Sequence, residues 1–388
     1  CSAAKSAGMT DFYVPAANAR EAAAIRGINV YAVKSVRQLI AHLNGTELMT
    51  PVPPSTSEPS VYAEGMPNFS DVQGQALAKR AMEIAAAGGH NILLIGPPGT
   101  GKSMLAKRLP TILPPLSFDE AVETTKIHSV AGTLKENVAL IADRPFRSPH
   151  HTMSAVSLVG GGINPKPGEI SLANNGVLFL DELPEFPKQV TESLRQPLED
   201  GKITITRAAG RVTYPCSFML VAAMNPCRCG YYGDTRHTCT CSQNEIKNYI
   251  SRISGPLLDR IDIQVVLPGL TYDELSVKTS NEEPSAKIRE RVIKAREFAA
   301  KRFSSERGIF CNAQLDSAML RKHCKIDDAA SVLLRKAYDS MGLSARGYDR
   351  TLRLARTIAD LAGSETIGAA HIAEAIQFRT LDRKFWGN

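Results

Sequence analysis

The segment that most constrains this chain is the glycine-rich run at residues 96–103, which reads GPPGTGKS. It follows an apolar stretch at 91–95 that is typical of a buried strand, and a helical pattern continues over 104–109. Glycines in such a turn let backbone N–H groups surround phosphates, while the lysine reaches the β- and γ-phosphates and the hydroxyl binds Mg²⁺. The residues predicted to bind ATP with Mg²⁺ are Gly96, Pro97, Pro98, Gly99, Thr100, Gly101, Lys102 and Ser103.

Other periodic segments place this loop in an α/β fold. Residues 177–180 and 218–223 are apolar runs typical of buried strands, and residues 72–88 have helical spacing. Strands separated by helices pair in parallel, so we expect a parallel sheet. Residues 202–214 alternate in polarity and turn at 208–210, which predicts a β-hairpin.

Two carboxylates follow the strand at 177–180. We expect Asp181 to hold Mg²⁺ or its water shell, and Glu182 to orient and deprotonate the attacking water. A solvated acidic turn would explain this motif by itself, but the phosphate loop favours the catalytic interpretation. Asn225 follows the strand at 218–223, which should neighbour the strand that ends at Asp181. We therefore predict that Asn225 positions water near the γ-phosphate.

Arginines in the C-terminal half are candidates for completing the site. Arg260 lies between apolar residues and is predicted to stabilise, in trans, the charge that develops in phosphoryl transfer. A surface salt bridge from Asp259 to Arg260 fits the spacing equally well. Arg350 is predicted to reach the nucleotide from a helix, with Arg353 and Arg356 on the same helix as alternatives. Helical spacing over 286–303, 316–320, 329–341, 350–361 and 369–378 predicts an all-helical C-terminal domain.

Four of the eight cysteines are packed into a short segment: Cys227, Cys229, Cys239 and Cys241. Two close pairs of thiolates suit tetrahedral Zn²⁺, with His237 as a spare ligand. A reduced cysteine-rich loop is the alternative. We predict a structural zinc site because clustered thiols without a metal are prone to oxidation. The scattered remaining cysteines indicate a reducing compartment.

Composition and charge set wide limits on function. Hydrophobic residues make up 43% of the chain and charged residues 22%, as in ordinary globular proteins. The net charge of +7 permits nucleic-acid binding without requiring it. No apolar run approaches membrane-spanning length, and a cytoplasmic location is expected.

Cys1 as first residue fits either an acylated lipoprotein or a fragment, and the need for cytosolic ATP favours the fragment. The adjacent His150 and His151 are assigned no metal.

As a set, these motifs resemble the magnesium chelatase-like AAA+ ATPases, and among them the bacterial competence proteins. The most specific stretches are residues 144–151, 160–169, 175–186, 194–201, 225–230 and 254–262. The resemblance implies a homo-hexamer with ATP sites between subunits, in which Arg260 acts on the neighbour's ATP and Arg350 is a second sensor. It also implies an N-terminal Lon-protease-like domain. The expected divisions are a Lon-like remnant at 1–48, a Pro/Ser-rich linker at 49–67, an AAA+ core at 68–270 with a cysteine-rich insertion at 225–242, and a helical lid at 271–388.

The same resemblance suggests a DNA partner. Proteins of the competence branch bind DNA and drive branch migration of recombination intermediates during natural transformation. The hairpin at 202–214 and an insertion at 148–168 would then lie near a central pore. The predicted phosphate contacts to single-stranded or branched DNA are Lys166, Lys202, Arg207 and Arg211, with solvated loop charges as the alternative.

Two other functions use the same ATP chemistry. One is a chelatase-type motor subunit for inserting a metal into a porphyrin, and the other is a protein-remodelling ATPase. The Lon-like remnant and the cysteine cluster favour the competence branch over the chelatase. Protein remodelling predicts an exposed aromatic residue at a pore-loop tip, for which Tyr214 and Phe146 are the nearest candidates.

Overall fold

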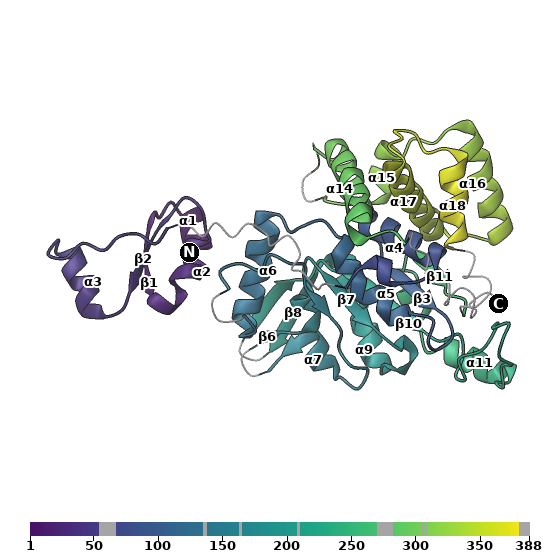
Figure 1. Cartoon of the computed structure of the whole chain (residues 1–388), viewed down its shortest axis with the longest axis horizontal. Helices are drawn as coiled ribbons and strands as arrows, with labels where there is room; N and C mark the ends of the chain where they lie inside the picture. The colour runs from purple at the N-terminus through teal and green to yellow at the C-terminus, as the bar shows by residue number, and fades with distance from the viewer. Residues whose placement is uncertain are drawn as a thin grey trace. The chain divides into compact units, whose positions relative to one another are not determined.

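The computed structural model describes residues 1–53, 67–134, 138–162, 165–207, 210–269, 282–304, 306 and 309–379. The chain divides into two compact units, both drawn in Figure 1. One comprises Cys1–Ala63 and Pro115–Arg144, and the other comprises Glu64–Pro114 and Pro145–Asn388. The four divisions expected from the sequence remain a prediction.

The first unit is built on two parallel strands. β1 (Asp11–Pro15) pairs with β2 (Asn29–Val33), which brings the rings of Tyr13 and Tyr31 into a stack with centroids 5.0 Å apart. A small core forms where alanines of α2 (Ala19–Ala23) pack against Val30. The unit also contains α1 (Ser2–Ser6), η1 (Ala16–Asn18), α3 (Val36–Leu43) and α6 (Phe118–Ala131).

The second unit contains a five-stranded parallel sheet in the order β11-β3-β10-β7-β4. Its strands are β3 (Ile92–Ile95), β4 (Phe146–Arg147), β7 (Val177–Leu180), β10 (Met219–Met224) and β11 (Ile263–Val266). The predicted parallel sheet is confirmed, including the expected pairing of β10 with β7. Because β10 lies between β3 and β7, the phosphate loop, Asp181 and Asn225 all follow neighbouring strands.

Both faces of this sheet are buried, because neighbouring residues along a strand point to opposite sides. Ile92 and Leu94 of β3 join a core with α4 (Ala76–Gly88) and the C-terminal helices. Leu93 and Ile95 join a second core with α9 (Lys188–Ser193) and α11 (Gln243–Ile250). The three central strands β3, β10 and β7 are accordingly continuous apolar runs.

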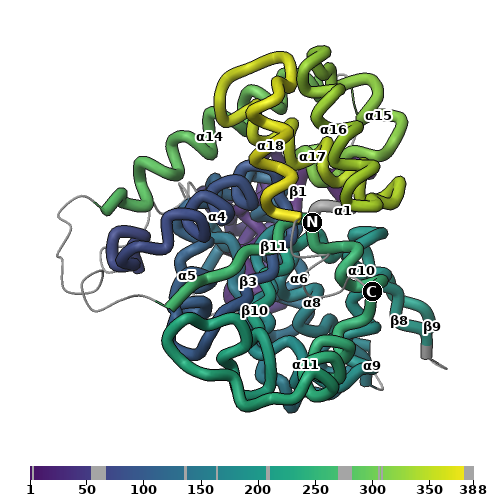
Figure 2. The backbone as a smooth tube through the Cα atoms, turned by 90° about the vertical axis from the view of Figure 1, so that its right-hand side faces the viewer, coloured from purple at the N-terminus to yellow at the C-terminus, as the bar shows by residue number. Residues whose placement is uncertain are grey.

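Short elements precede the sheet strands or connect them. They are η2 (Phe69–Asp71), α5 (Lys102–Arg108), η3 (Leu109–Ile112), α7 (Ala155–Val159), β5 (Gly160–Gly161), β6 (Lys166–Pro167), α8 (Glu169–Leu172), η4 (Leu183–Glu185), α10 (Arg195–Asp200), β8 (Lys202–Arg207), β9 (Gly210–Pro215) and α12 (Gly255–Leu258). The predicted hairpin is present as antiparallel β8 and β9, which extend from the α/β part in Figure 2.

The C-terminal region is helical, as predicted, and its helices lie together at the top of Figure 2. It contains α14 (Ser285–Arg302), η5 (Asn312–Gln314), α15 (Ser317–His323), α16 (Asp328–Met341), α17 (Ala345–Leu361) and α18 (Ala369–Gln377).

Two predicted helix starts are wrong. α17 begins at Ala345 instead of residue 350, because the Ser344 side chain caps it by accepting a hydrogen bond from the Gly347 N–H. α4 begins at Ala76 instead of residue 72, because Gly74 and Gln75 have positive φ angles of 60° and 53° that no α-helix contains.

A buried polar network joins the sheet to the helical region. His90 lies within hydrogen-bond distance of the Asp262 carboxylate (Nδ1 to Oδ2, 3.2 Å) and the Thr357 hydroxyl (Nε2 to Oγ1, 2.7 Å). The Asn312 amide donates to the Thr357 hydroxyl and to the Asp360 carboxylate, at 3.0 and 2.7 Å. Burial alone would raise the pKa of Asp262, but the hydrogen bond and charge of His90 lower it. These five residues fasten α17 to the end of the sheet.

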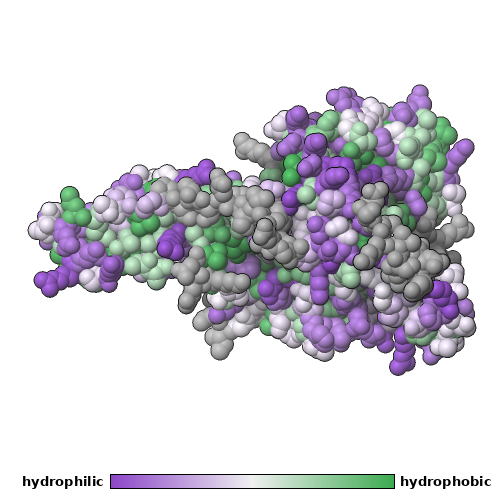
Figure 3. Space-filling view, in the orientation of Figure 1, coloured by the Kyte–Doolittle hydropathy of each residue, from purple (hydrophilic) through white to green (hydrophobic). Residues whose placement is uncertain are grey.

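The surface of the described residues is mixed. On the face drawn in Figure 3, hydrophilic and hydrophobic residues alternate over the second unit. Among the residues that the structure describes, none of the helices has the length and apolar character needed to cross a membrane.

Candidate active site

The phosphate loop connects β3 to α5 at the carboxyl end of the sheet. Gly101 has a φ of 87°, which favours glycine, and α5 begins at the next residue. Thr100 donates its hydroxyl hydrogen to the Pro97 carbonyl at 2.9 Å. The Gln75 amide donates to the carbonyls of Pro268 and Thr100, at 2.8 and 3.4 Å, and so ties the loop to the chain after β11. This role of Gln75 could not be predicted from the sequence, because both acceptors are backbone atoms distant in the chain.

Lys102 is buried at the centre of the loop. Its ammonium donates to the carbonyls of Gly96 and Pro97, at 2.6 and 2.8 Å, and to Asn225 Oδ1 at 3.1 Å. Burial lowers the pKa of Lys102 to about 8, although the charges of Asp181 and Glu182 oppose the shift. The structure thus brings the predicted lysine and Asn225 into direct contact.

Oxygen atoms suited to Mg²⁺ lie beside this lysine. The Ser103 hydroxyl donates to Asp181 Oδ2 at 2.6 Å, so a hydroxyl from the start of α5 and a carboxylate from the end of β7 converge. Hydroxyl and carboxylate oxygens are the ligands that Mg²⁺ prefers, and the pair fits this ion. Glu182 follows with a φ of 54°, and its N–H donates to Asp181 Oδ1 at 3.0 Å. A non-glycine residue in this conformation is uncommon and indicates a turn that the surrounding fold imposes.

His151 is a neighbour of Glu182 that the sequence did not reveal. Its Nδ1 lies 3.4 Å from Glu182 Oε2, and its ring meets Phe186 edge-on. The ring of His150 lies 4.2 Å from the ring of His151. Both histidines follow β4, the edge strand beside β7, and only the strand order shows that His151 reaches Glu182.

Arg260 and Arg350 occupy one region near α12. The Arg260 guanidinium binds the Glu199 carboxylate and donates to the Pro256 carbonyl at 2.6 Å. Asp259 instead accepts a hydrogen bond from Arg350 at 2.9 Å, so the Asp259–Arg260 salt bridge considered above is not formed.

Three arginines on α17 are candidates for reaching the nucleotide. Of these, Arg350 bonds to the α/β part, through Asp259 and the Leu258 carbonyl. Arg353 donates to the Leu315 carbonyl, and the fully buried Arg356 bonds to Asp360 and to carbonyls after α17. These contacts favour Arg350 as the arginine that faces the nucleotide-binding part. Its role as a sensor stays a prediction.

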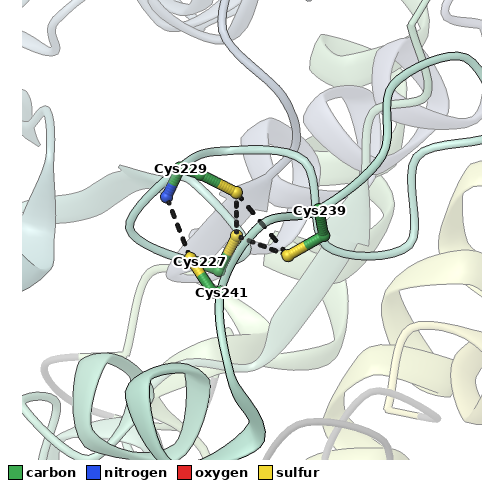
Figure 4. Close-up of side chains that lie close together, drawn as sticks. All are labelled: Cys227, Cys229, Cys239 and Cys241. Atoms are coloured by element: carbon green, nitrogen blue, oxygen red, sulfur yellow. Dashed lines mark hydrogen bonds between the residues drawn. The ribbon is translucent and has the colours of Figure 1, made fainter.

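The four clustered cysteines converge, as Figure 4 shows. Their sulfur atoms all lie within 4.8 Å of one another. His237 is not part of this group, and its Nδ1 lies 2.8 Å from Asp234 Oδ2. The predicted spare ligand is therefore occupied elsewhere.

The residues predicted to contact DNA lie on the hairpin and the insertion before it. Lys202, Arg211 and Lys166 are exposed, whereas the Arg207 side chain lies outside the described residues. Lys202 and Arg211 share one face of the hairpin, and Ile203 and Ile205 on the opposite face are buried.

Comparison with known proteins identifies the group to which these features belong. A family model described as "Magnesium chelatase, subunit ChlI" matches residues 68–275, and its C-terminal counterpart matches residues 282–379. The chain belongs to the magnesium chelatase-like AAA+ ATPases. It therefore has the α/β ATPase core and helical C-terminal region of that family, and the family uses ATP and Mg²⁺.

Individual relatives add detail. The chain is 44% identical to the competence protein ComM of Haemophilus influenzae, over 94% of this chain and 71% of ComM. It is 46% identical to the YifB protein of Escherichia coli, over 81% of this chain and 61% of YifB. A lower similarity, 25% over 75% of this chain and 34% of the relative, links it to the DNA replication licensing factor mcm2 of Schizosaccharomyces pombe.

Proposed function

We propose that this chain is the motor of a homo-hexameric ATPase that acts on single-stranded or branched DNA, as a helicase promoting branch migration in natural transformation. The observation that carries the DNA part is a set of exposed basic residues on two elements that are joined to each other. The Tyr214 hydroxyl on β9 donates to the Pro165 carbonyl beside β6 at 2.8 Å, which joins the hairpin to the insertion. Lys166, Lys202 and Arg211 are exposed on the joined elements.

Phosphate contacts of this kind bind DNA without reading its sequence. A motor that moves along any DNA needs such contacts, because base-specific bonds would stop it at particular sites. Two similarities point the same way: the name of one relative refers to competence and that of another to DNA replication. Tyr214, one of the two aromatic residues considered for protein remodelling, is half-buried and bonded to Pro165.

The ATP chemistry follows from the contacts around Lys102. Lys102 would bind the β- and γ-phosphates, and Ser103 and Asp181 would hold Mg²⁺, which neutralises charge on the phosphates. Glu182 would take the proton from the attacking water, with His151 holding its carboxylate in place. Asn225, whose Oδ1 accepts a hydrogen bond from Lys102, would position that water beside the γ-phosphate.

Arg260 and Arg350 would complete the site from outside the loop. Arg260 bonds to Glu199 and Pro256, neither of which belongs to the phosphate loop, and this supports a role at a neighbouring subunit's ATP. Arg350, bonded to Asp259 next to Arg260, would report nucleotide binding to the helical region. We further propose that residues 1–48 are the end of a Lon-protease-like domain.

The test uses a three-stranded or four-way DNA substrate with one fluorescent strand, followed with ATP for the wild-type protein and for Glu182→Gln. We expect the wild type to resolve the substrate. Glu182→Gln should bind ATP and DNA yet leave the substrate intact, because no residue deprotonates the water. ATP hydrolysis that proceeds without resolving the substrate and is indifferent to all DNA would reject the DNA motor and favour the chelatase function that the family description names.

A further inference from the structure

The four clustered cysteines have the geometry of a metal site. Three sulfur–sulfur separations are 3.3 Å (Cys227 to Cys229), 3.7 Å (Cys227 to Cys239) and 3.6 Å (Cys229 to Cys239). Four thiolates at about 2.3 Å from a tetrahedral Zn²⁺ lie about 3.8 Å from one another. Two disulfides would instead require two pairs at about 2.0 Å with the pairs well separated. The observed spacing matches tetrahedral zinc.

The surroundings of the cluster support the same conclusion. The Cys229 N–H points at Cys241 Sγ, 3.4 Å away, as a donor that stabilises a thiolate (Figure 4). Cys227 is fully buried and packs in the core that covers one face of the sheet. Cys241 directly precedes Ser242, whose hydroxyl caps α11. The ligands are thus held by three parts of the fold: a sheet strand end, a turn and a helix start.

Two links through neighbouring residues connect the cluster to the ATP site. Cys227 comes two residues after Asn225, whose Oδ1 accepts the hydrogen bond from Lys102 at 3.1 Å. Gly230, in the turn after Cys229, has a φ of 91°, and a Cβ at this position would lie 2.7 Å from Pro98 Cδ in the phosphate loop. The turn that the cysteines hold therefore packs directly against the loop that binds phosphate.

We propose that Cys227, Cys229, Cys239 and Cys241 bind one Zn²⁺, and that this site positions Asn225 and the phosphate loop for ATP binding. The cysteines are positioning residues here, because none of them contacts Lys102 or the carboxylates. The coupling rests on ATP binding at Lys102, whereas zinc binding depends on neither the ATP nor the DNA activity. Experiments can therefore contradict the effect on ATP binding without contradicting the zinc site.

The first measurement is the metal content of protein purified under reducing conditions without chelator. We expect about one zinc per chain, as a single four-ligand site requires. Cys239→Ser should lose the zinc, and Cys1→Ser, which removes an exposed cysteine outside the cluster, should keep it. Co²⁺ in place of zinc should give the absorption of a tetrahedral four-thiolate site. A folded wild-type protein without zinc, or with iron instead, would overturn the proposal.

The second measurement is the affinity for a fluorescent ATP analogue. Removing zinc from the wild type with a chelator should weaken binding by about fivefold or more, the usual size of coupling between two sites, and adding Zn²⁺ back should restore it. This measurement does not depend on the folding of Cys239→Ser. Gly230→Ala should keep its zinc but bind nucleotide more weakly, because its Cβ meets Pro98. Unchanged affinity in both experiments would reject the coupling while leaving the metal site standing.

Discussion

Burial of the Lys102 side chain sets the chemistry of the nucleotide site. The ammonium lies among two carbonyls and an amide oxygen, which pair with its charge but replace only part of the water it has lost. Its lowered pKa of about 8 is the result. A nucleotide phosphate at this position would supply the missing negative charge and favour the protonated lysine.

This pKa makes nucleotide binding depend on pH in a range where ATP itself does not titrate. Below pH 8 Lys102 is charged, and above it the neutral form, which attracts phosphate less, dominates. We expect affinity for an ATP analogue at constant Mg²⁺ to fall as pH rises, by at most about tenfold from pH 7 to pH 9. Fluorescence titration measures the affinity at each pH. Lys102→Arg, which stays charged, should give a flat profile, and equal slopes for both proteins would contradict the lysine assignment.

At the scale of elements, the two faces of the β8–β9 hairpin differ because apolar and polar side chains alternate along its strands. Isoleucines bury one face against the rest of the unit, and this leaves Lys202 and Arg211 on the other. The insertion strands β5 and β6 support the buried face: a Cβ at Gly160 would lie 2.9 Å from Ile205 Cδ1. The charged face can therefore change without disturbing the packing.

We predict that the double variant Lys202→Ala, Arg211→Ala binds DNA more weakly and with a smaller salt dependence. Removing two phosphate contacts should reduce the slope of log affinity against log salt by about 2, since each contact releases roughly one counterion. Titration at several salt concentrations measures the slope. The control Lys294→Ala, Arg335→Ala removes the same charge from exposed positions on α14 and α16. An equal loss in both variants would show that net charge, and not the hairpin, attracts DNA.

Much of the fold could be predicted from the sequence, because its signals are local. The strands at 177–180 and 218–223, the hairpin and the five C-terminal helices follow from periodicity, and their ends move by a few residues where caps or positive φ angles intervene. Contacts such as His151 with Glu182, or Gln75 with Pro268, escaped prediction. They join residues far apart in the chain and have no spacing rule, so only the strand order reveals them.

At the scale of the whole molecule, the placement of Arg260 bears on assembly. Its described contacts hold it at α10 and α12, through Glu199 and Pro256, while the ATP-binding residues lie at the ends of β3 and β7. If Arg260 serves another subunit's site, an isolated chain would bind ATP without hydrolysing it rapidly. Assembly would then control the motor.

A mixing experiment tests this arrangement. Arg260→Ala and Glu182→Gln should each lower turnover by about 10³-fold or more, as expected for loss of a finger arginine or of the residue that activates water. Mixed oligomers should regain on the order of a quarter of wild-type turnover, because a quarter of random interfaces pair an intact Glu182 with an intact Arg260. Arg346→Ala, an exposed neighbour, should have little effect. No recovery on mixing, with mixed oligomers present, would show that Arg260 acts within its own subunit.

The buried network of His90, Asp262, Thr357, Asn312 and Asp360 restricts how this protein can be recombined with its relatives. A chimera that takes its helical region from another member would place that member's side chains opposite His90 and Asp262. Any mismatch would leave a buried charge or hydroxyl without a partner, at a cost of about 1–3 kcal/mol for each such group. The crossover point of a chimera should therefore not lie between the sheet and the helical region. The two parts have to be exchanged as a single block, with the network kept whole.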